Sequence, residues 1–207
     1  MSRGFARTAV VLGLLSCVGP VSIDMYLPAM PQIAEGLGAD SASVQATLSA
    51  YFLAFGLAQL VYGPLADQYG RKGPIVVGLV VFLLASVGCA TAQDAGWLVG
   101  FRFLQGLGGA AVMVIPRAIV RDLHTGPEAA RLMALVMLVI SISPMLAPLG
   151  GTLIMTLSDW RGIFWFMAAA ALLSIAMTVL MQAETLPREL RVPVNVPNLL
   201  SGSRDLL

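Results

Sequence analysis

The chain has 207 residues, of which 58% are hydrophobic and only 11% are charged, and its mean hydropathy is +0.87. A soluble globular domain carries about 25% charged residues, so this composition excludes a protein surrounded by water and favours one embedded in a lipid bilayer. The net charge of +1 and the scattering of charges among short segments also exclude a basic face for nucleic acid.

Six apolar stretches follow one another along the chain, each bounded by segments that hold nearly all the charge. A helix needs roughly 20 apolar residues to cross about 30 Å of hydrocarbon. The stretches meet this length and are apolar on every face, unlike the alternating strands of a membrane barrel. We therefore predict an all-α membrane protein with six transmembrane helices. The predicted spans are about residues 8–28, 44–66, 74–92, 97–116, 132–157 and 162–181.

The distribution of Lys and Arg predicts which loops face the cytoplasm. Of the twelve basic residues, Arg102 lies within a predicted span and Arg161 is the only one in a loop on the opposite side. The other ten share one side, so we expect a multi-pass protein with both the N-terminus and the C-terminus in the cytoplasm. They are Arg3, Arg7, Arg71, Lys72, Arg117, Arg121, Arg131, Arg188, Arg191 and Arg204.

The two ends of the chain differ from the spans. Arg3 and Arg7 precede the first apolar run as in a secretory signal, but the run exceeds the usual length of about 7 to 15 residues and lacks a small-residue cleavage pattern. From residue 184, prolines occur among polar residues. We predict a membrane domain over 1–183 and a cytoplasmic linker over 184–207. Cys17 and Cys89 lie inside spans, so we expect buried thiols and no metal site.

Asp24 and Arg102 are the charged residues within the predicted spans. Each costs about 2.5 to 3.5 kcal/mol at a helix centre. Counted from Pro31 and Trp97, both lie roughly 8 to 10 Å inside the outer boundary, so a pair is geometrically allowed. One interpretation is a permanent salt bridge between two helices. The other is that Asp24 carries a proton, and that its uptake and release accompany a change of conformation.

The turn predicted between spans two and three runs from Gly63 to Gly73 and contains Asp67, Arg71 and Lys72. Its glycines permit positive φ and close helix approach, and Asp67 can accept hydrogen bonds from a helix N-terminus or an arginine. From these residues alone, a specialised turn and an ordinary basic cytoplasmic turn are equally good interpretations.

Several of these segments resemble signatures of one family, the major facilitator superfamily. Gly63 to Lys72 resembles its loop between helices two and three, and Ile23 to Pro31 resembles the first-helix signature of its Bcr/CflA drug-resistance branch. The fourth and fifth spans resemble motifs of its drug:proton antiporters, although Ala147 and Thr152 stand where many members have glycine, which leaves the closeness of helix packing there open. The matching residues in these two spans are Arg102, Gln105, Gly106, Gly108 and Gly109, and Pro144, Ala147, Pro148 and Gly151.

The resemblance implies the N-terminal six-helix half of a 3+3 inverted-repeat fold in a bacterial inner membrane. It implies efflux of drug-like amphipathic molecules by alternating access, with the proton gradient as energy source and no cofactor. The implied roles are proton coupling for Asp24 and Arg102, gating for the second-to-third-span loop and the charge cluster near it, and helix packing for the remaining motif residues. The gating residues are Gly63, Asp67, Gly70, Arg71, Arg121 and Asp122, and the packing residues are Pro28, Gln105, Gly106, Gly109, Pro148 and Gly151.

The family has about twelve spans in two halves, whereas six are predicted here. We expect a fragment or truncated product whose partners are membrane lipid, a small drug-like substrate and the missing C-terminal half, in preference to a homodimer of half-size carriers. A six-span scaffold or regulatory fragment without transport fits the composition equally well but does not explain the matched depths of Asp24 and Arg102. An intramembrane hydrolase needs a nucleophile and a base, and His124, the only histidine, lies in a predicted loop.

Overall fold

In the computed structural model, which describes residues 3–192 of the chain, every regular element is helical. This confirms the predicted all-α class. The tail beyond residue 192, including Arg204, lies outside the described residues. In chain order the elements are α1 (Arg3–Asp24), η1 (Leu27–Ala29), α2 (Met30–Leu37), α3 (Ser41–Tyr69), α4 (Lys72–Ala90), α5 (Ala95–Leu123), α6 (Gly126–Leu157), α7 (Arg161–Met181) and η2 (Arg188–Leu190).

Six helical segments of the described chain are long and apolar enough to cross a membrane, which confirms the predicted number. The first, Phe5–Leu37, combines α1, η1 and α2, and α3 to α7 form one segment each. Several helices run past the predicted spans into charged sequence. For example, α5 continues to Leu123 and α6 begins at Gly126. Hydropathy detects the apolar centre of a span, whereas the helix continues for one or two turns into the polar boundary.

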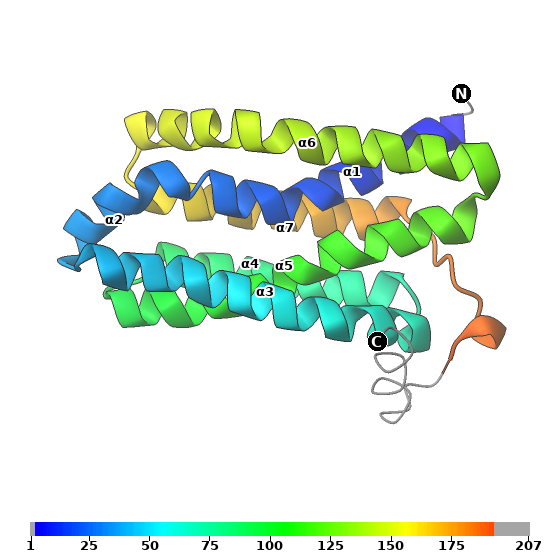
Figure 1. Cartoon of the computed structure of the whole chain (residues 1–207), viewed down its shortest axis with the longest axis horizontal. Coiled ribbons are helices and arrows are strands. Elements are labelled where there is room, and N and C mark those ends of the chain that lie inside the picture. Colours follow the sequence, from blue (N-terminus) through cyan, green and yellow to red (C-terminus); the bar gives the residue numbers. More distant parts are fainter. Residues whose placement is uncertain (1–2, 193–207) are drawn as a thin grey trace, which may run out of the picture.

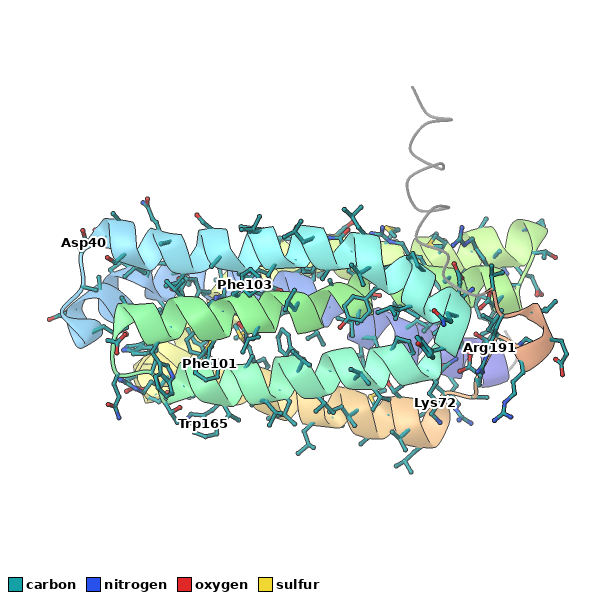
Figure 2. All side chains as sticks on the ribbon, turned by 90° about the horizontal axis from the view of Figure 1, so that it is seen from below. Asp40, Lys72, Phe101, Phe103, Trp165 and Arg191 are labelled. Carbon is teal, nitrogen blue, oxygen red and sulfur yellow. The ribbon has the colours of Figure 1, made fainter. Side chains whose placement is uncertain are left out.

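The helices form two layers (Figure 1). Four lie side by side in the order α6, α1, α5 and α3, while α4 and α7 pack together behind them, α4 against α5 and α7 against α1. Figure 2 shows Asp40 at one end of the bundle and Lys72 with Arg191 at the other. We call these the Asp40 end and the Lys72 end. The guanidinium of Arg7 donates to the carbonyl of Met181, so α1 begins and α7 ends at the Lys72 end.

Glycines on α5 allow it to lie at the centre of the bundle. A Cβ added to Gly106 would overlap the backbone carbonyl of Tyr51 on α3, and one added to Gly108 would overlap the backbone of Gly78 on α4. Small residues at such positions let membrane helices approach closely enough for backbone packing. Side chains on the inner faces of α5 are therefore shut off from the surroundings.

The outer surface of the bundle is apolar. Leu157 and Leu180 are 81% and 80% exposed, and many other large hydrophobic side chains lie outside in the same way. A surface of this kind is costly in water and is suited to lipid or to another apolar helix. The least buried of the six spanning segments are α3 and α6, the two outer members of the four-helix layer.

Candidate functional site

The first spanning segment is broken directly after Asp24. Pro28 has no N–H to give to the carbonyl of Asp24, so the regular i to i−4 pattern cannot continue. The chain tightens instead, and the N–H of Tyr26 donates to the carbonyl of Ile23 at 3.2 Å. The carbonyl of Ser22, which Tyr26 would have used in an unbroken helix, is thereby left for another donor. Pro28 thus acts by breaking the helix.

Arg102 on α5 supplies that donor. Its Nη1 donates to the Ser22 carbonyl at 3.2 Å and to Oε1 of Gln105 at 2.6 Å. The side chain is completely buried, and its guanidinium carbon lies 4.3 Å and 4.4 Å from the ring centroids of Tyr26 and Tyr51. Two aromatic faces attract the cation electrostatically, most strongly where water is excluded. Arg102 therefore joins α5 to the break in the first segment.

A polar network surrounds the guanidinium and fixes the residues that hold it. Gln105 donates through Nε2 to the hydroxyl of Ser86 at 2.8 Å, and the hydroxyls of Ser22 and Tyr51 share a hydrogen bond of 2.7 Å. Nε and Nη2 of Arg102 have no hydrogen-bond partner among residues 3–192. A buried donor without a partner is costly in a low-dielectric interior, so these two nitrogens are the atoms of Arg102 that could bind a further acceptor.

Asp24 does not pair with Arg102. Within the described residues the Asp24 side chain is partly buried and forms no hydrogen bond or ion pair. The interpretation of a permanent salt bridge is therefore wrong for this structure. Arg102 reaches the carbonyl of Ser22, and Ser22 and Asp24 lie roughly 200° apart around a helix of 3.6 residues per turn. Equal depth along the spans does not put the two side chains on one face.

A second cluster lies at the Lys72 end, where the predicted turn is found. Nη1 of Arg71 donates to Oδ1 of Asp67 at 2.6 Å, and its Nε donates to Oδ2 of Asp122 at 2.8 Å. The Arg71 side chain is 9% exposed and that of Asp122 is 18% exposed, so solvent screens this ion pair less than the pair with Asp67, whose side chain is 54% exposed. Arg71 ties the end of α3 to the end of α5. Arg121 is exposed and forms no ion pair within the described chain.

The turn itself is shorter than predicted. Helix α3 continues through Gly63 and Asp67 to Tyr69, so only Gly70 and Arg71 connect it to α4. Gly70 has φ 92°, a conformation that side chains with a Cβ rarely adopt. Gly63 lies in the helix, and a Cβ added there would meet nothing within 4 Å of this chain. Of these two predicted gating glycines, Gly70 is thus the one whose lack of a side chain the local structure requires.

The predicted packing residues on α6 lie beside the broken first segment. A Cβ on Gly151 would come within 2.6 Å of the carbonyl oxygen of Met25, so α6 approaches the break closely at this glycine. Ala147 is buried, whereas Pro148 is only partly buried. Thr152 is exposed, and its hydroxyl donates to the Pro148 carbonyl at 2.9 Å. Threonine in place of glycine at position 152 therefore does not disturb the close approach of Gly151 to Met25, because the Thr152 side chain points away from that contact.

An apolar cavity of about 360 Å³ opens between α1 and α6, and its lining includes Met25, the residue that follows Asp24. This volume lies within the range of roughly 300 to 1,000 Å³ that holds drug-sized ligands. Its lining also includes Cys17 and Ala147, the residue that stands where many members of the family that this sequence resembles have glycine. No group of acidic, histidine or cysteine side chains in residues 3–192 could hold a metal ion. The full lining is Cys17, Val21, Met25, Val139, Ile142, Ser143, Leu146, Ala147, Gly150 and Phe166.

Glu184 is a member of the Lys72-end cluster that the sequence analysis did not identify. Its carboxylate accepts hydrogen bonds from the backbone N–H groups of Arg71 at 2.8 Å and Lys72 at 3.2 Å. Burial opposes ionisation of Glu184, but the N–H donors of Arg71, Leu186, Lys72 and Thr185 together hold its pKa below the ordinary value of 4.5. The available signal was an acid placed directly after an apolar span, and spacing alone could not connect it to Arg71.

Comparison with known proteins gives consistent matches. The family model described as Major Facilitator Superfamily matches residues 12–198. The MFS-type transporter YdgK of Bacillus subtilis is 38% identical over 96% of this chain, and the bicyclomycin resistance protein homolog of Haemophilus influenzae is 34% identical over 96%. The multidrug resistance protein MdtL of Escherichia coli is 35% identical over 91%. The chain spans about half the length of these relatives.

Solved structures show the same fold. The human organic anion transporter MFSD10 (TETRAN) superposes with a TM-score of 0.77 at 19% identity, over 95% of this chain and 53% of that protein. The peptide transporter POT in complex with sulfate gives a TM-score of 0.77 at 17% identity, over 97% of this chain and 43% of that protein. The six-helix bundle thus corresponds to about half of a full-length transporter fold.

Proposed function

Because this chain belongs to the Major Facilitator Superfamily, we propose that it acts as the N-terminal half of a proton-coupled exporter of small amphipathic drugs in the bacterial inner membrane. Its membership of a transporter family argues against the hydrolase interpretation. The observation that carries the proposal is Arg102, a fully buried cation without a carboxylate partner in residues 3–192, bound to the carbonyl that is freed at the break after Asp24.

Asp24 is the proposed proton carrier. An ionised carboxylate needs water or a cationic partner, whereas the protonated acid can enter a closed apolar interior at much lower cost. Because Asp24 has no ion pair in the described chain, proton uptake changes its charge without first breaking a salt bridge. Each charge that crosses the whole membrane gives about 2.3 kcal/mol per 100 mV. This energy would drive the alternation between outward-open and inward-open states.

The Lys72-end cluster of Arg71, Asp67 and Asp122 is the proposed gate. The positive-inside rule supports a cytoplasmic position for the Lys72 end, and in that orientation the ion pairs of Arg71 with Asp67 and Asp122 would lie at the inner mouth of the carrier. These pairs would hold the cytoplasmic ends of α3 and α5 in one arrangement. A rearrangement of these pairs would change the surface that this half presents to the second half at the cytoplasmic end. The two halves would then separate there and expose the interior to the cytoplasm.

The layer of α6, α1, α5 and α3 is the proposed interface with the second half of the carrier. Its outer helices, α3 and α6, are the least buried of the spanning segments, and the chain spans about half the length of its relatives. The apolar cavity between α1 and α6 would offer such a carrier an apolar surface for drug-like molecules. A second copy of the chain is the alternative occupant of this face.

The test of the proton site compares Asp24→Asn with Glu35→Gln, which changes an exposed acid of the same spanning segment. Cells that lack their own exporters produce each variant, and ethidium efflux is measured after a pH gradient is imposed. We expect at least tenfold slower efflux for Asp24→Asn, at equal membrane abundance, and wild-type efflux for Glu35→Gln. Proton-coupled efflux by Asp24→Asn at the wild-type rate would overturn the assignment.

The partner is tested by the composition and mass of the complex purified in detergent. A complex that contains a different six-span half supports the proposed architecture, and a complex of two identical chains supports a homodimeric carrier. If the wild-type chain produces no efflux in either form, it is a scaffold or regulatory fragment, and the proposed function fails.

A further inference from the structure

The segment that follows α7 folds back onto the Lys72 end of the bundle. We propose that Glu184 is a positioning residue for the gate, and that residues 182–192 act as a strap that fixes the turn carrying Arg71. This inference rests on the proposed function for its role in transport. Its structural content, that Glu184 holds the start of α4 and the Arg71 turn, can be tested independently.

The ends of α4 and α7 bind each other reciprocally. Glu184, which follows α7, accepts from the backbone N–H groups of Arg71 and Lys72 at the start of α4. Lys72 in turn donates through Nζ to the carbonyl of Val179 in the last turn of α7, at 2.8 Å. The carboxylate of Glu184 thus lies at the positive N-terminal end of the α4 dipole, and the ammonium of Lys72 lies at the negative C-terminal end of the α7 dipole. Both interactions are electrostatically favourable. The two helix ends are locked by complementary charges.

The carboxylate of Glu184 also shapes its own segment. Its Oε1 accepts from the N–H groups of Thr185 at 3.0 Å and Leu186 at 3.1 Å, in addition to that of Arg71. One side chain therefore satisfies donors on both sides of the contact. Removing it would leave the first turn of α4 and the start of the strap without their acceptor.

The strap reaches both acids that hold Arg71. The hydroxyl of Thr185 donates to Oδ2 of Asp122 at 3.1 Å, and the N–H of Val192 donates to the carbonyl of Asp67 at 3.2 Å. Oδ2 of Asp122 is also the oxygen that accepts from Nε of Arg71. The strap and the gating arginine thus share an acceptor, so displacement of the strap removes bonds from both partners of Arg71.

Gly70 makes room for the strap as well as for the turn. A Cβ at this position would lie 2.5 Å from Oε2 of Glu184 and 2.8 Å from Nη2 of Arg191. Nη2 of Arg191 in turn lies 4.0 Å from Oε2 of Glu184. A side chain at position 70 would thus be unfavourable for two reasons. The positive φ would strain the backbone, and the strap already fills the space into which the side chain would extend.

The test is hydrogen exchange of the intact chain in lipid nanodiscs, comparing wild type with Glu184→Ala and Glu184→Gln. The matched control is Glu189→Ala, which removes an exposed acid of the same segment. We expect exchange of the peptide over residues 70–73 to rise at least fivefold in Glu184→Ala and less in Glu184→Gln, which keeps one oxygen acceptor. Exchange of the loop over residues 91–94, at the Asp40 end, should be unchanged, as should every peptide in Glu189→Ala.

Two outcomes would overturn the positioning role. Unchanged exchange at residues 70–73 in Glu184→Ala would show that the carboxylate does not hold the turn. A similar rise at both ends of the bundle would show that Glu184 only stabilises the fold. Ethidium efflux is measured in parallel, with at least a fivefold loss expected for Glu184→Ala. If the wild type itself shows no efflux while the local exchange effect is present, the proposed function fails and the structural assignment stands.

Discussion

Arg102 donates to the backbone carbonyl of Ser22 at 3.2 Å, two residues before Asp24, and this contact joins the fourth spanning segment to the break in the first. The Ser22 carbonyl is free for this contact because the N–H of Tyr26 donates to Ile23 instead, at the break where Pro28 has no N–H to give to the carbonyl of Asp24. The proposed coupling of Asp24 to Arg102 would therefore run through the backbone between Asp24 and Ser22, because no ion pair joins the two side chains in the described chain.

Replacement of Arg102 by Met should separate stability from function. The change removes a buried charge that has no carboxylate partner in the described chain and keeps similar volume. Such replacements are often neutral or stabilising, although here the Ser22 carbonyl and Gln105 lose a donor. We expect an apparent melting temperature in detergent no lower than that of the wild type, together with loss of proton-coupled efflux. A variant that still transports would remove Arg102 from the mechanism.

Arg102→Ala is the companion variant for this experiment. It removes the same charge but leaves a cavity between Tyr26 and Tyr51, and large-to-small changes in a packed interior cost about 2 to 5 kcal/mol. We expect it to melt below both wild type and Arg102→Met. If Met and Ala variants were equally destabilised, the charge and its hydrogen bonds would be supporting the fold, contrary to the first expectation.

Gly106→Ala should destabilise the bundle, because its Cβ would overlap the backbone carbonyl of Tyr51, which cannot rotate away. Overpacking of this kind typically costs about 1 to 3 kcal/mol. Gly100→Ala on the same helix is the matched control, since a Cβ there meets nothing within 4 Å, and alanine favours a helix by up to about 1 kcal/mol over glycine. Thermal unfolding in detergent should therefore rank Gly100→Ala at or above wild type and Gly106→Ala below it. The reverse ranking would contradict the central position of α5.

The number and class of the spans could be predicted from the sequence because they depend on local composition. Six apolar stretches of sufficient length can satisfy their backbone groups in a membrane only as helices. The predicted ends of the helices are less accurate than their number. Helices α5 and α6 continue into charged sequence, which a hydropathy criterion leaves out of a span.

The sequence indicates candidate residues for a site but not the contacts that they make. Asp24 and Arg102 lie at matching depths along their spans, but depth does not determine which side of a helix a residue faces. Ser22, which Arg102 contacts, and Asp24 face different sides of α1. The aromatic faces around Arg102 come from separate segments, Tyr26 from the break after α1 and Tyr51 from α3, so no local spacing indicates them. Glu184 was missed for the same reason, because its partners precede it by more than a hundred residues.

Gly70→Ala should release the strap at the Lys72 end. Alanine is strained at a φ of 92°, at a cost of about 1 to 3 kcal/mol, and its Cβ would displace the carboxylate of Glu184. Gly73→Ala, three residues along in the first turn of α4, adds a methyl group to open space and serves as the control. We expect faster tryptic cleavage after Arg188 and Arg191 in Gly70→Ala and wild-type cleavage in Gly73→Ala. Equal cleavage in the two variants would contradict the proposed contact between turn and strap.

The contribution of Glu184 to stability should disappear in acid. Its pKa in the folded chain lies below the ordinary value of 4.5, so the carboxylate stabilises the fold at every pH above that value and loses this contribution as pH falls through the folded pKa. Glu184→Gln lacks the titrating group but keeps its size. The difference in melting temperature between wild type and Glu184→Gln should therefore be constant above about pH 5 and should shrink as pH falls below 4.5 and through the lowered pKa of the folded chain. Glu189→Gln, which changes an exposed acid nearby, should show no such pH-dependent difference. A gap for Glu184→Gln that stayed the same throughout the acid range in which the chain remains folded would mean that ionisation of Glu184 is not what holds the strap.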